Sequence, residues 1–348
     1  MSSRQIVASA VLLCCSLVMA GCETDRPTGP TPGKTQPASP GGNTATARSY
    51  PYRIATTCSM VTDIVRTVAG ERGEVKGLMG EGVDPHLYKP TRNDARQLLS
   101  ADIIFYSGLM LEGRMADTFI RVARSGKTVY AVTEEIDESY LREPPEFDGH
   151  WDPHVWMDVR AWSKCTEFVA TALSDFDPPG AEEYKKNSDA YVARLDELDK
   201  YARKVIATIP EDRRVLVTAH DAFGYFSMVY NIQVKSVLGS TTESDAGIKD
   251  INNLVDFIVD HKIAAVFAES SVNNKGIQAV IAGAKKRGWQ VQIGGTLYSD
   301  AMGAPDTYEG TYIGMIDHNA TVIARALGGQ APERGLNGRL AAGGQSSK

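Results

Sequence analysis

Short apolar runs alternate with amphipathic segments along most of this 348-residue chain, from about residue 52 onwards. Strands that alternate with helices form parallel sheets covered by helices on both faces, so the sequence predicts an α/β fold. We expect strands at 53–57, 75–79, 102–107, 128–132, 214–219, 234–238, 264–268 and 291–293. We expect helices at 60–69, 91–99, 111–124, 159–174, 248–260 and 276–287.

One long charged segment, residues 182–208, interrupts this alternation. Large apolar side chains recur in it at helical spacing, and a Pro-Pro-Gly turn precedes it. At 1.5 Å per residue such a helix would be about 40 Å long, which is long for a helix inside one domain. We therefore predict a rigid connecting helix at residues 181–210, between an N-terminal α/β lobe at 51–180 and a C-terminal α/β lobe at 211–330. An ordinary long surface helix is the alternative.

The first 22 residues have the pattern of a lipoprotein signal. Arg4 is followed by an apolar run at 6–19 that is too short to span a bilayer, and the segment ends in Met-Ala-Gly-Cys. We predict that residues 1–21 are a signal peptide and that Cys22 becomes the lipidated first residue of an extracytoplasmic, membrane-anchored protein, in a periplasm or on a cell surface. An ordinary cleaved signal with an incidental cysteine is the alternative.

Two further segments have the composition of unfolded chain. Residues 22–50 are rich in Pro, Gly, Ser and Thr and nearly free of large apolar residues, which predicts a flexible tether. Residues 331–348 are expected to form a disordered tail.

Charge and cysteine content exclude several classes of protein. The formal net charge of −6 argues against non-specific nucleic-acid binding. Cys58 and Cys165 do not make a disulfide scaffold or a zinc motif, so buried free thiols are the preferred interpretation, although a bridge is possible outside the cytoplasm. The sequence contains no convincing nucleotide-binding fingerprint, and Gly294-Gly295 is interpreted as a turn.

A short motif occurs twice and places a histidine directly after a proline. Asp84-Pro85-His86 and Asp152-Pro153-His154 are each followed by an apolar residue and an aromatic one. Proline restricts its own φ and biases the preceding residue towards extended geometry, and aspartate can bond the backbone two residues on. Each motif therefore predicts a tight turn that holds one imidazole in place.

Two more polar groups follow predicted strands. His220 ends the strand-like run at 214–219, and Asp300 follows the stretch from residue 291 to residue 298. Ligands of open α/β sheets bind beyond the carboxyl ends of the strands. With His86 and His154 from one lobe and His220 and Asp300 from the other, the sequence predicts a metal site in the cleft between the lobes. A single histidine at a strand end would more often be structural.

Three imidazoles and a carboxylate suit zinc, and manganese or iron less exclusively. Histidines that bind a metal usually donate their second ring N–H to an oxygen, which makes Asp152, Asp221 and Glu269 candidate supporting residues. Helix capping or solvation of these carboxylates is the alternative. Since an imidazole must be neutral to bind metal, we expect affinity to fall as the pH drops through about 6.5.

These motifs together resemble those of the TroA-like cluster of zinc- and manganese-binding lipoproteins that supply ABC importers. The resemblance covers about residues 52–327. It implies two α/β lobes, a connecting helix, one buried Zn²⁺ or Mn²⁺ per chain as cargo, and ligand roles for His86, His154, His220 and Asp300. It is carried by Gly82-Val83-Asp84-Pro85-His86-Leu87-Tyr88, Asp152-Pro153-His154-Val155-Trp156, Ala219-His220-Asp221-Ala222-Phe223-Gly224-Tyr225-Phe226, Phe267-Ala268-Glu269-Ser270-Ser271-Val272, Tyr298-Ser299-Asp300-Ala301-Met302-Gly303, Glu309-Gly310-Thr311-Tyr312 and His318-Asn319.

The leading interpretation is a monomeric solute-binding lipoprotein, not an enzyme, that captures a divalent transition metal and delivers it to an ABC permease. Some members of the resembled family have a histidine-rich loop before the second ligand, whereas residues 134–153 contain only His150. Some manganese-selective members have Glu at the third position, where this chain has His220. The two differences point in opposite directions, so they do not identify the metal. A zinc-dependent metallohydrolase and a surface adhesin with a structural metal are the alternatives.

Overall fold

The computed structural model describes residues 50–147 and 149–341, which belong to one compact unit. The predicted signal peptide, the lipidation of Cys22 and the tether up to residue 49 lie outside the described residues. Within the described part of the chain, none of the helices is long and apolar enough to cross a membrane.

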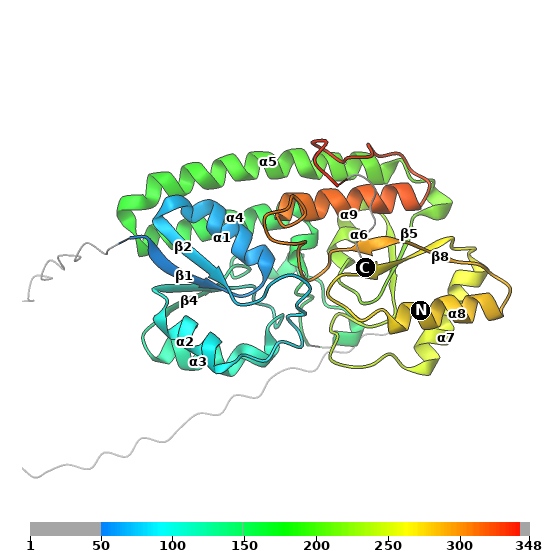
Figure 1. Ribbon diagram of the computed structural model, residues 1–348, viewed down its shortest axis with the longest axis horizontal. Coiled ribbons are helices and arrows are strands. Elements are labelled where there is room, and N and C mark those ends of the chain that lie inside the picture. Colours follow the sequence, from blue (N-terminus) through cyan, green and yellow to red (C-terminus); the bar gives the residue numbers. More distant parts are fainter. Residues whose placement is uncertain (1–49, 148, 342–348) are drawn as a thin grey trace, which may run out of the picture. The chain divides into compact units, whose positions relative to one another are not determined.

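The N-terminal lobe contains a parallel four-stranded sheet in the order β2-β1-β3-β4 (Figure 1). Side chains of alternate residues point to opposite faces of a strand. Ile54 and Phe105 therefore join the core on the side of α1, whereas Ala55 and Ile104 pack on the side of α2 and α3. The bounds are β1 Tyr52–Thr56, α1 Ser59–Ala69, β2 Gly73–Gly77, α2 Arg92–Ser100, β3 Ile103–Tyr106, α3 Ala116–Arg124 and β4 Thr128–Ala131.

The C-terminal lobe contains two parallel pairs of strands, β5-β6 and β7-β8, and β5 contacts β7. Val217 and Val266 form a core with α7 and α8, while Leu216 and Phe267 face the larger core that includes α5 and α9. The bounds are β5 Val215–Thr218, α6 Gly224–Tyr230, β6 Gln233–Ser236, α7 Ile248–Asp260, β7 Ala265–Glu269, α8 Lys275–Lys286, β8 Gln292–Leu297 and α9 Tyr312–Ala326.

Strand β8 is longer than the sequence indicates, because Gly294 and Gly295 lie inside it rather than in a turn. The register of β8 against β7 shifts between Val266 and Phe267, so the pair contains an irregularity at these glycines. A Cβ atom at Gly294 would lie 2.8 Å from the Cβ of Ala326 in α9 and 2.9 Å from the ring of Phe267. The glycines therefore allow α9 to approach the strand, a use of glycine inside sheets that sequence alone does not distinguish from a turn.

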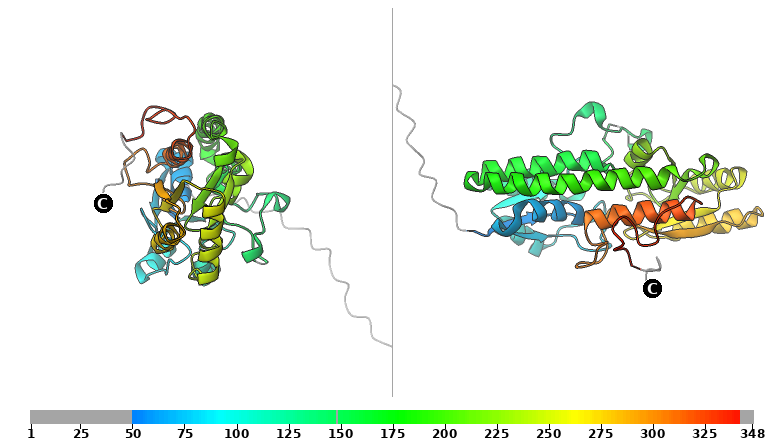
Figure 2. Two further views of the ribbon diagram at one scale, coloured as in Figure 1. Left: turned by 90° about the vertical axis from the view of Figure 1, so that its right-hand side faces the viewer. Right: turned by 90° about the horizontal axis from the view of Figure 1, so that it is seen from above.

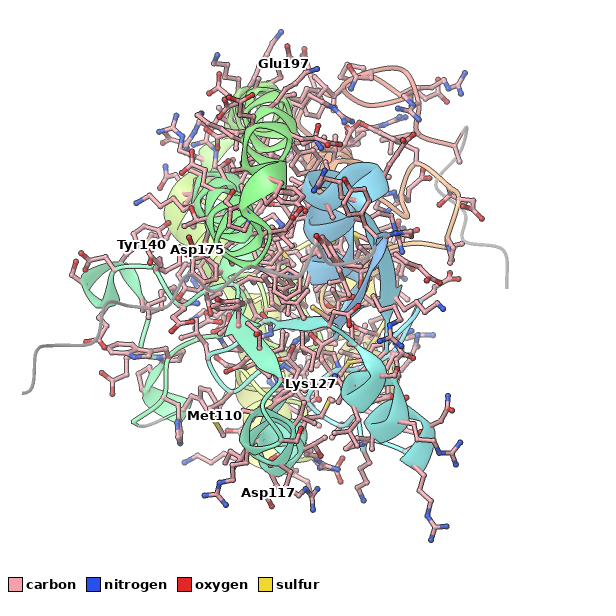
Figure 3. All side chains as sticks on the ribbon, turned by 90° about the vertical axis from the view of Figure 1, so that its left-hand side faces the viewer. Met110, Asp117, Lys127, Tyr140, Asp175 and Glu197 are labelled. Atoms are coloured by element: carbon pink, nitrogen blue, oxygen red, sulfur yellow. The ribbon has the colours of Figure 1, made fainter. Side chains whose placement is uncertain are left out.

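The predicted connecting helix is confirmed as α5, Ala181–Ala207 (Figures 1 and 2). It packs along α4, Val159–Phe176, and also contacts α1 of the first lobe and α6 and α9 of the second. Its apolar side is buried at helical spacing, whereas Glu197 lies on its outer surface (Figure 3). One continuous helix thus contacts both lobes, and the predicted fold class is confirmed. The residue boundaries of the two lobes stay a prediction.

A fully buried carboxylate fastens this helix to its neighbours. Asp199 of α5 accepts a 2.8 Å hydrogen bond from Arg160 of α4, another of 2.8 Å from Arg203, and one of 3.2 Å from Tyr230 at the end of α6. A buried charge with this many donors is satisfied rather than costly. These contacts link α4, α5 and α6 through one side chain.

The expected disorder of the C-terminal tail is wrong for residues 331–341. The backbone N–H of Leu336 donates to both carboxylate oxygens of Asp317 in α9, at 2.9 and 3.0 Å, and Leu340 is buried. The polar, glycine-rich composition suggested an unfolded tail, but a buried acceptor on α9 binds it. Cys58 and Cys165 are buried and unbridged, as preferred from the sequence.

Candidate metal centre

The four predicted ligands come together in the structure. His86, His154, His220 and Asp300 are all buried, and they offer donor atoms that lie within 4.8 Å of one another. His86 follows β2, His154 lies in the loop after β4, His220 follows β5 and Asp300 follows β8. All four lie beyond the carboxyl ends of parallel strands, where α/β folds bind their ligands.

Several distances between the donor atoms are close to the edges of a tetrahedral metal shell. His86 Nε2 lies 3.3 Å from His154 Nε2 and 3.7 Å from Asp300 Oδ2. Asp300 Oδ1 lies 3.4 Å from His154 Nε2, and Asp300 Oδ2 lies 3.1 Å from His220 Nε2. A tetrahedron with metal–donor bonds of about 2.0–2.1 Å has edges of about 3.3–3.4 Å. These four residues can therefore hold one small cation without large rearrangement.

The polar atoms at the centre of the cluster face one another. Among the described residues, His220 Nε2 and both carboxylate oxygens of Asp300 are buried and contact only groups of the cluster, with Asp300 Oδ2 3.1 Å from His220 Nε2 and Asp300 Oδ1 3.4 Å from His154 Nε2. Buried polar atoms in native proteins are nearly always paired, and each unpaired one needs an explanation. Convergent lone pairs in a dry site are the donor set that a metal cation satisfies.

The first Asp-Pro-His turn forms as its sequence predicts. Asp84 Oδ1 accepts a 2.9 Å hydrogen bond from the backbone N–H of His86, two residues on. The other oxygen, Asp84 Oδ2, accepts a 2.6 Å bond from the hydroxyl of Thr242 in the C-terminal lobe. This carboxylate therefore shapes the turn and joins it to the opposite lobe.

The second turn uses its aspartate differently. Asp152 Oδ1 accepts the backbone N–H of His154 at 3.0 Å and also lies 2.7 Å from the ring atom His154 Nδ1. Asp152 Oδ2 pairs with the guanidinium of Arg142. The carboxylate thus orients the imidazole so that Nε2 points at the cluster; the supporting role of Asp152 at a metal stays a prediction.

Glu269, at the end of β7, supports the third histidine in the same way. Its Oε2 lies 2.6 Å from His220 Nδ1, and its Oε1 accepts the backbone N–H groups of Ala219 and His220 at 2.7 and 2.9 Å. One buried carboxylate therefore contacts both the backbone and the ring of His220.

Aromatic side chains position the loop that carries Asp300. The indole N–H of Trp156, two residues after His154, donates to the carbonyl of Ser299 at 2.9 Å. The carbonyl of Trp156 in turn accepts the hydroxyl of Tyr312 at 2.7 Å. Asp300 is thereby tied to the turn of His154 through direct contacts between the lobes.

The pKa values of the clustered groups differ because their neighbours differ. Burial lowers the pKa of His86 to about 3. Burial also opposes protonation of His154, but the bonds to Asp152 and the proximity of Asp300 outweigh it and raise its pKa to about 9. The pKa of His220 is raised well above its usual value by Asp300 and Glu269 despite burial. Burial would raise the pKa of Asp300, yet the charges of His220 and His154 hold it well below its usual range.

These shifts describe the electrostatics of the metal-free site. Asp152, Glu269 and Asp300 place three buried carboxylates around three imidazoles. Two imidazolium protons, on His154 and His220, compensate part of that negative charge. A divalent cation would supply the same charge as those two protons, so metal and protons compete for the site.

Asp221 and Arg142 form a neighbouring ion-pair cluster. Asp221 Oδ2 lies 3.6 Å from Arg142 Nη2, so Arg142 faces both Asp221 and Asp152. A Cβ atom at Gly224 would collide with this guanidinium, which explains the glycine at that position. Arg142 was not predicted from the sequence, because a single arginine in a Pro- and Glu-rich loop carries no recognisable signal.

Two α/β lobes, a long helix that contacts both, and a buried cluster of three histidines and one aspartate define a two-lobed metal-binding protein. The family model described as ZnuA, zinc-uptake complex component A, periplasmic, matches residues 54–326, and the chain belongs to this family.

Individual relatives are similar over most of the chain. The manganese-binding lipoprotein MntA of Bacillus subtilis is 41% identical over 325 residues, which cover 93% of this chain and 99% of the relative. The zinc-binding protein TroA of Treponema pallidum is 43% identical over 287 residues, which cover 82% and 92% of the two chains. The solved structure of periplasmic zinc-binding TroA superposes with a TM-score of 0.77 over 79% of this chain and 99% of that one.

Proposed function

We propose that this protein captures Zn²⁺ or Mn²⁺ as cargo, one ion per chain, and delivers it to the membrane permease of an ABC importer. The observation that best supports this is the buried cluster of His86, His154, His220 and Asp300, whose donor atoms lie within 4.8 Å of one another. A bound cation would take the place of the protons that these buried groups share. These four residues are the proposed ligands.

The donor set and the relatives support two candidate metals. Three imidazole nitrogens with a carboxylate are typical of zinc sites and also occur in manganese and iron sites. The relatives include a protein named for manganese and one named for zinc. By the Irving–Williams order zinc binds more tightly than manganese to most such sites in vitro, so affinity alone does not identify the cargo.

We propose further that the protein is not an enzyme. A catalytic zinc usually keeps one position for water beside three protein ligands and a nearby general base. Here four protein side chains converge. Glu269, the carboxylate one would nominate as the base, already accepts contacts from His220 Nδ1 and two backbone N–H groups. This carboxylate is therefore not free to accept a proton from a metal-bound water.

A purely structural metal in an adhesin is the other alternative. Most of the buried apolar side chains belong to strands and helices, and the ligand-bearing loops add a few, among them Trp156, Phe223 and Met302. Normal folding of the chelated protein would support cargo binding, since a structural metal contributes to folding outright. Loss of the circular-dichroism signal on chelation would support the structural role instead.

We also propose that the protein is a monomer held at the outer face of a membrane through lipidated Cys22 and a flexible tether. The Met-Ala-Gly-Cys segment and the Pro- and Gly-rich stretch after it support this. Cys22→Ala should release the protein from the membrane fraction, and a chain that begins at Tyr50 should bind metal normally. Membrane retention of a processed Cys22→Ala protein would contradict the lipid anchor, and light scattering tests the monomer.

The decisive experiment combines metal analysis with uptake. We expect close to one transition metal per chain in protein purified from its native envelope, and reduced uptake of that same metal in a deletion strain. Restoration by the wild-type gene, but not by a His220→Ala gene, would link binding to transport. Normal uptake of zinc, manganese and iron in the deletion strain would contradict the proposed function.

A further inference from the structure

The loop between β6 and α7, residues 237–247, contacts the opposite lobe through two neighbouring side chains. The hydroxyl of Thr242 donates to Asp84 Oδ2 at 2.6 Å. Glu243 Oε1 accepts a 2.9 Å hydrogen bond from Arg114 Nε in the N-terminal lobe. The two contacts pair adjacent residues of one loop with two separate loops of the other lobe.

The contact of Thr242 reaches the metal site through a shared carboxylate. Asp84 Oδ1 holds the backbone N–H of His86, and Asp84 Oδ2 holds Thr242. The same group therefore positions a proposed ligand and attaches it to the other lobe. Separation of loop 237–247 from this turn requires that the bond between Thr242 and Asp84 breaks.

We propose that Thr242 and Asp84 form an interlobe latch, reinforced by Arg114 and Glu243, that slows release of the bound metal. Thr242 is a positioning residue that acts through Asp84, since it is not among the four clustered donors. The inference rests on the proposed function, because it concerns release of cargo from that site.

The latch acts on release because its bonds exist only while the loop rests on the N-terminal lobe. An interaction made in one of two arrangements shifts the population towards that arrangement by its own free energy. When such a bond is lost, the arrangement that frees the ion becomes more populated. Affinity differences between variants of one site mostly arise in the dissociation rate.

The two contacts should contribute unequally. The hydroxyl of Thr242 donates to an ionised, partly buried carboxylate, which makes a charge-assisted bond. The side chains of Arg114 and Glu243 are 32% and 48% exposed. Exposed ion pairs contribute little and are screened by salt. Most of the effect should therefore come from Thr242.

The test is the rate at which zinc-loaded full chain loses Zn²⁺ to an excess of a chromophoric chelator in stopped flow. Thr242→Val, which keeps the side-chain shape but removes the hydroxyl, should release zinc about tenfold faster, equivalent to about 1.4 kcal/mol. The association rate should change by less than about twofold. Thr242→Ser keeps the hydroxyl and should release zinc at the wild-type rate, a rescue that a merely structural role does not predict.

The second contact provides a matched pair of variants. Arg114→Met should raise the release rate by about twofold at low salt and by less at high salt. Lys185→Met is its control, because it removes an exposed ion pair with Asp189 on α5, far along the sequence from both loops. It should leave the release rate unchanged.

Different outcomes overturn different claims. Wild-type release from folded Thr242→Val, or equally fast release from Thr242→Ser and Thr242→Val, overturns the latch while the proposed function stands. A wild-type chain that binds no zinc overturns the proposed function and the latch with it. Unchanged melting temperatures of the metal-free variants show that the rates report on release. If Thr242→Val fails to fold, wild-type release from folded Thr242→Ala overturns the latch.

Discussion

The two Asp-Pro-His turns have the same local sequence and different chemistry. In both, the aspartate accepts the backbone N–H of the histidine two residues on, at 2.9 Å for His86 and 3.0 Å for His154. The pKa of His86 is nevertheless lowered to about 3 by burial, whereas that of His154 is raised to about 9. The two turns share the hydrogen bond from aspartate to backbone, but the pKa values of their histidines are shifted in opposite directions.

The difference comes from the second oxygen and the ring. Asp152 also contacts His154 Nδ1, at 2.7 Å, and its remaining oxygen pairs with Arg142. Asp84 instead gives its second oxygen to Thr242, at 2.6 Å. The turn of Asp152 therefore favours protonation of its histidine. The turn of Asp84 instead connects its histidine to the opposite lobe. A repeated motif thus predicts where an imidazole lies but not its protonation.

The largest expected contrast is the stability of the metal-free variants. Both His86→Ala and His154→Ala should lose metal affinity by more than about 100-fold, since loss of a supporting residue alone costs about 10–100-fold. His154→Ala should also destabilise the metal-free protein by about 3–5 kcal/mol, because it leaves buried carboxylates without their imidazolium. His86→Ala should cost less, about 1–3 kcal/mol, because its ring is neutral.

Urea unfolding and calorimetric titration measure these two quantities. His261→Ala is the control, since this histidine stacks on Phe257 at an exposed helix end. Equal stability of the two metal-free variants would show that the turns do not differ electrostatically. Wild-type affinity in His86→Ala, His154→Ala, His220→Ala or Asp300→Ala would show that the residue concerned is not a ligand.

Metal loading should stabilise the wild-type chain by about 4 kcal/mol at a thousandfold excess over Kd, because the ion binds only the folded cluster. The reason is that one ion joins both turns to groups of the other lobe. Replacement of either turn's histidine should abolish most of this gain. Scanning calorimetry of chelated and loaded protein measures the shift, and identical melting temperatures for the two wild-type forms would contradict the bridging role.

The next largest difference between the two turns should appear in the pH dependence of metal affinity, because His154 and His86 differ in protonation. With pKa values of about 9 for His154 and well above normal for His220, both rings carry a proton at pH 7 in the metal-free protein. Both must lose it to bind metal, so affinity should rise with pH, by up to about 100-fold per unit below pH 9. His86, with a pKa of about 3, contributes no proton in that range.

The measurement is proton release during metal titration in weak buffer, with two protons per ion expected near pH 7. His154→Ala should release one proton fewer, and His86→Ala should not change the number. A midpoint near pH 6.5, as expected from the sequence, would show that the carboxylates do not raise these pKa values. The sign for folding is the reverse: the stability due to His154 protonation is fully present below about pH 6.5 and is lost as the pH rises through about 9.

The smallest expected difference is in the loss of metal affinity when each of the two aspartates is replaced by asparagine. Asp152→Asn should weaken metal binding by about 10–100-fold. A carboxylate accepts hydrogen bonds with both oxygens, from His154 on one side and Arg142 on the other, whereas an amide has only one oxygen that can accept. Asp84→Asn keeps one acceptor oxygen and supports no ring nitrogen, so a loss of about tenfold or less is expected. Competition with a zinc chelator gives both values. An equal or larger loss in Asp84→Asn would contradict the division of roles between the turns.

Much of the site was predictable because its signals are local. A strand end, a proline that restricts the backbone and an aspartate two residues before an amide are properties of short segments, and the structure brings His86 and His154 of these segments into one cluster. Asp152 and Glu269 were expected to support imidazoles, and the structure places each carboxylate against one ring. The ligand roles of the four clustered residues remain predictions.

Other features needed contacts between segments far apart in the chain. Asp221 lies beside Arg142, a residue that no local pattern singles out. The tail at 331–341 is ordered by a carboxylate on α9 rather than by its own composition. The glycines of β8 accommodate a neighbouring helix, not a turn.

The sequence by itself determined the alternation of strands and helices, the start of α5 and its end to within three residues, and the backbone turns that carry two imidazoles. These follow from steric restriction and from the periodicity of apolar residues, which act over a few neighbouring positions. Only the tertiary structure decided which imidazole carries a proton and which carboxylate reaches across the lobes. Charges interact through space over a few ångströms, so these properties depend on groups such as Arg142, Thr242 and Asp300, which folding alone brings to the two turns.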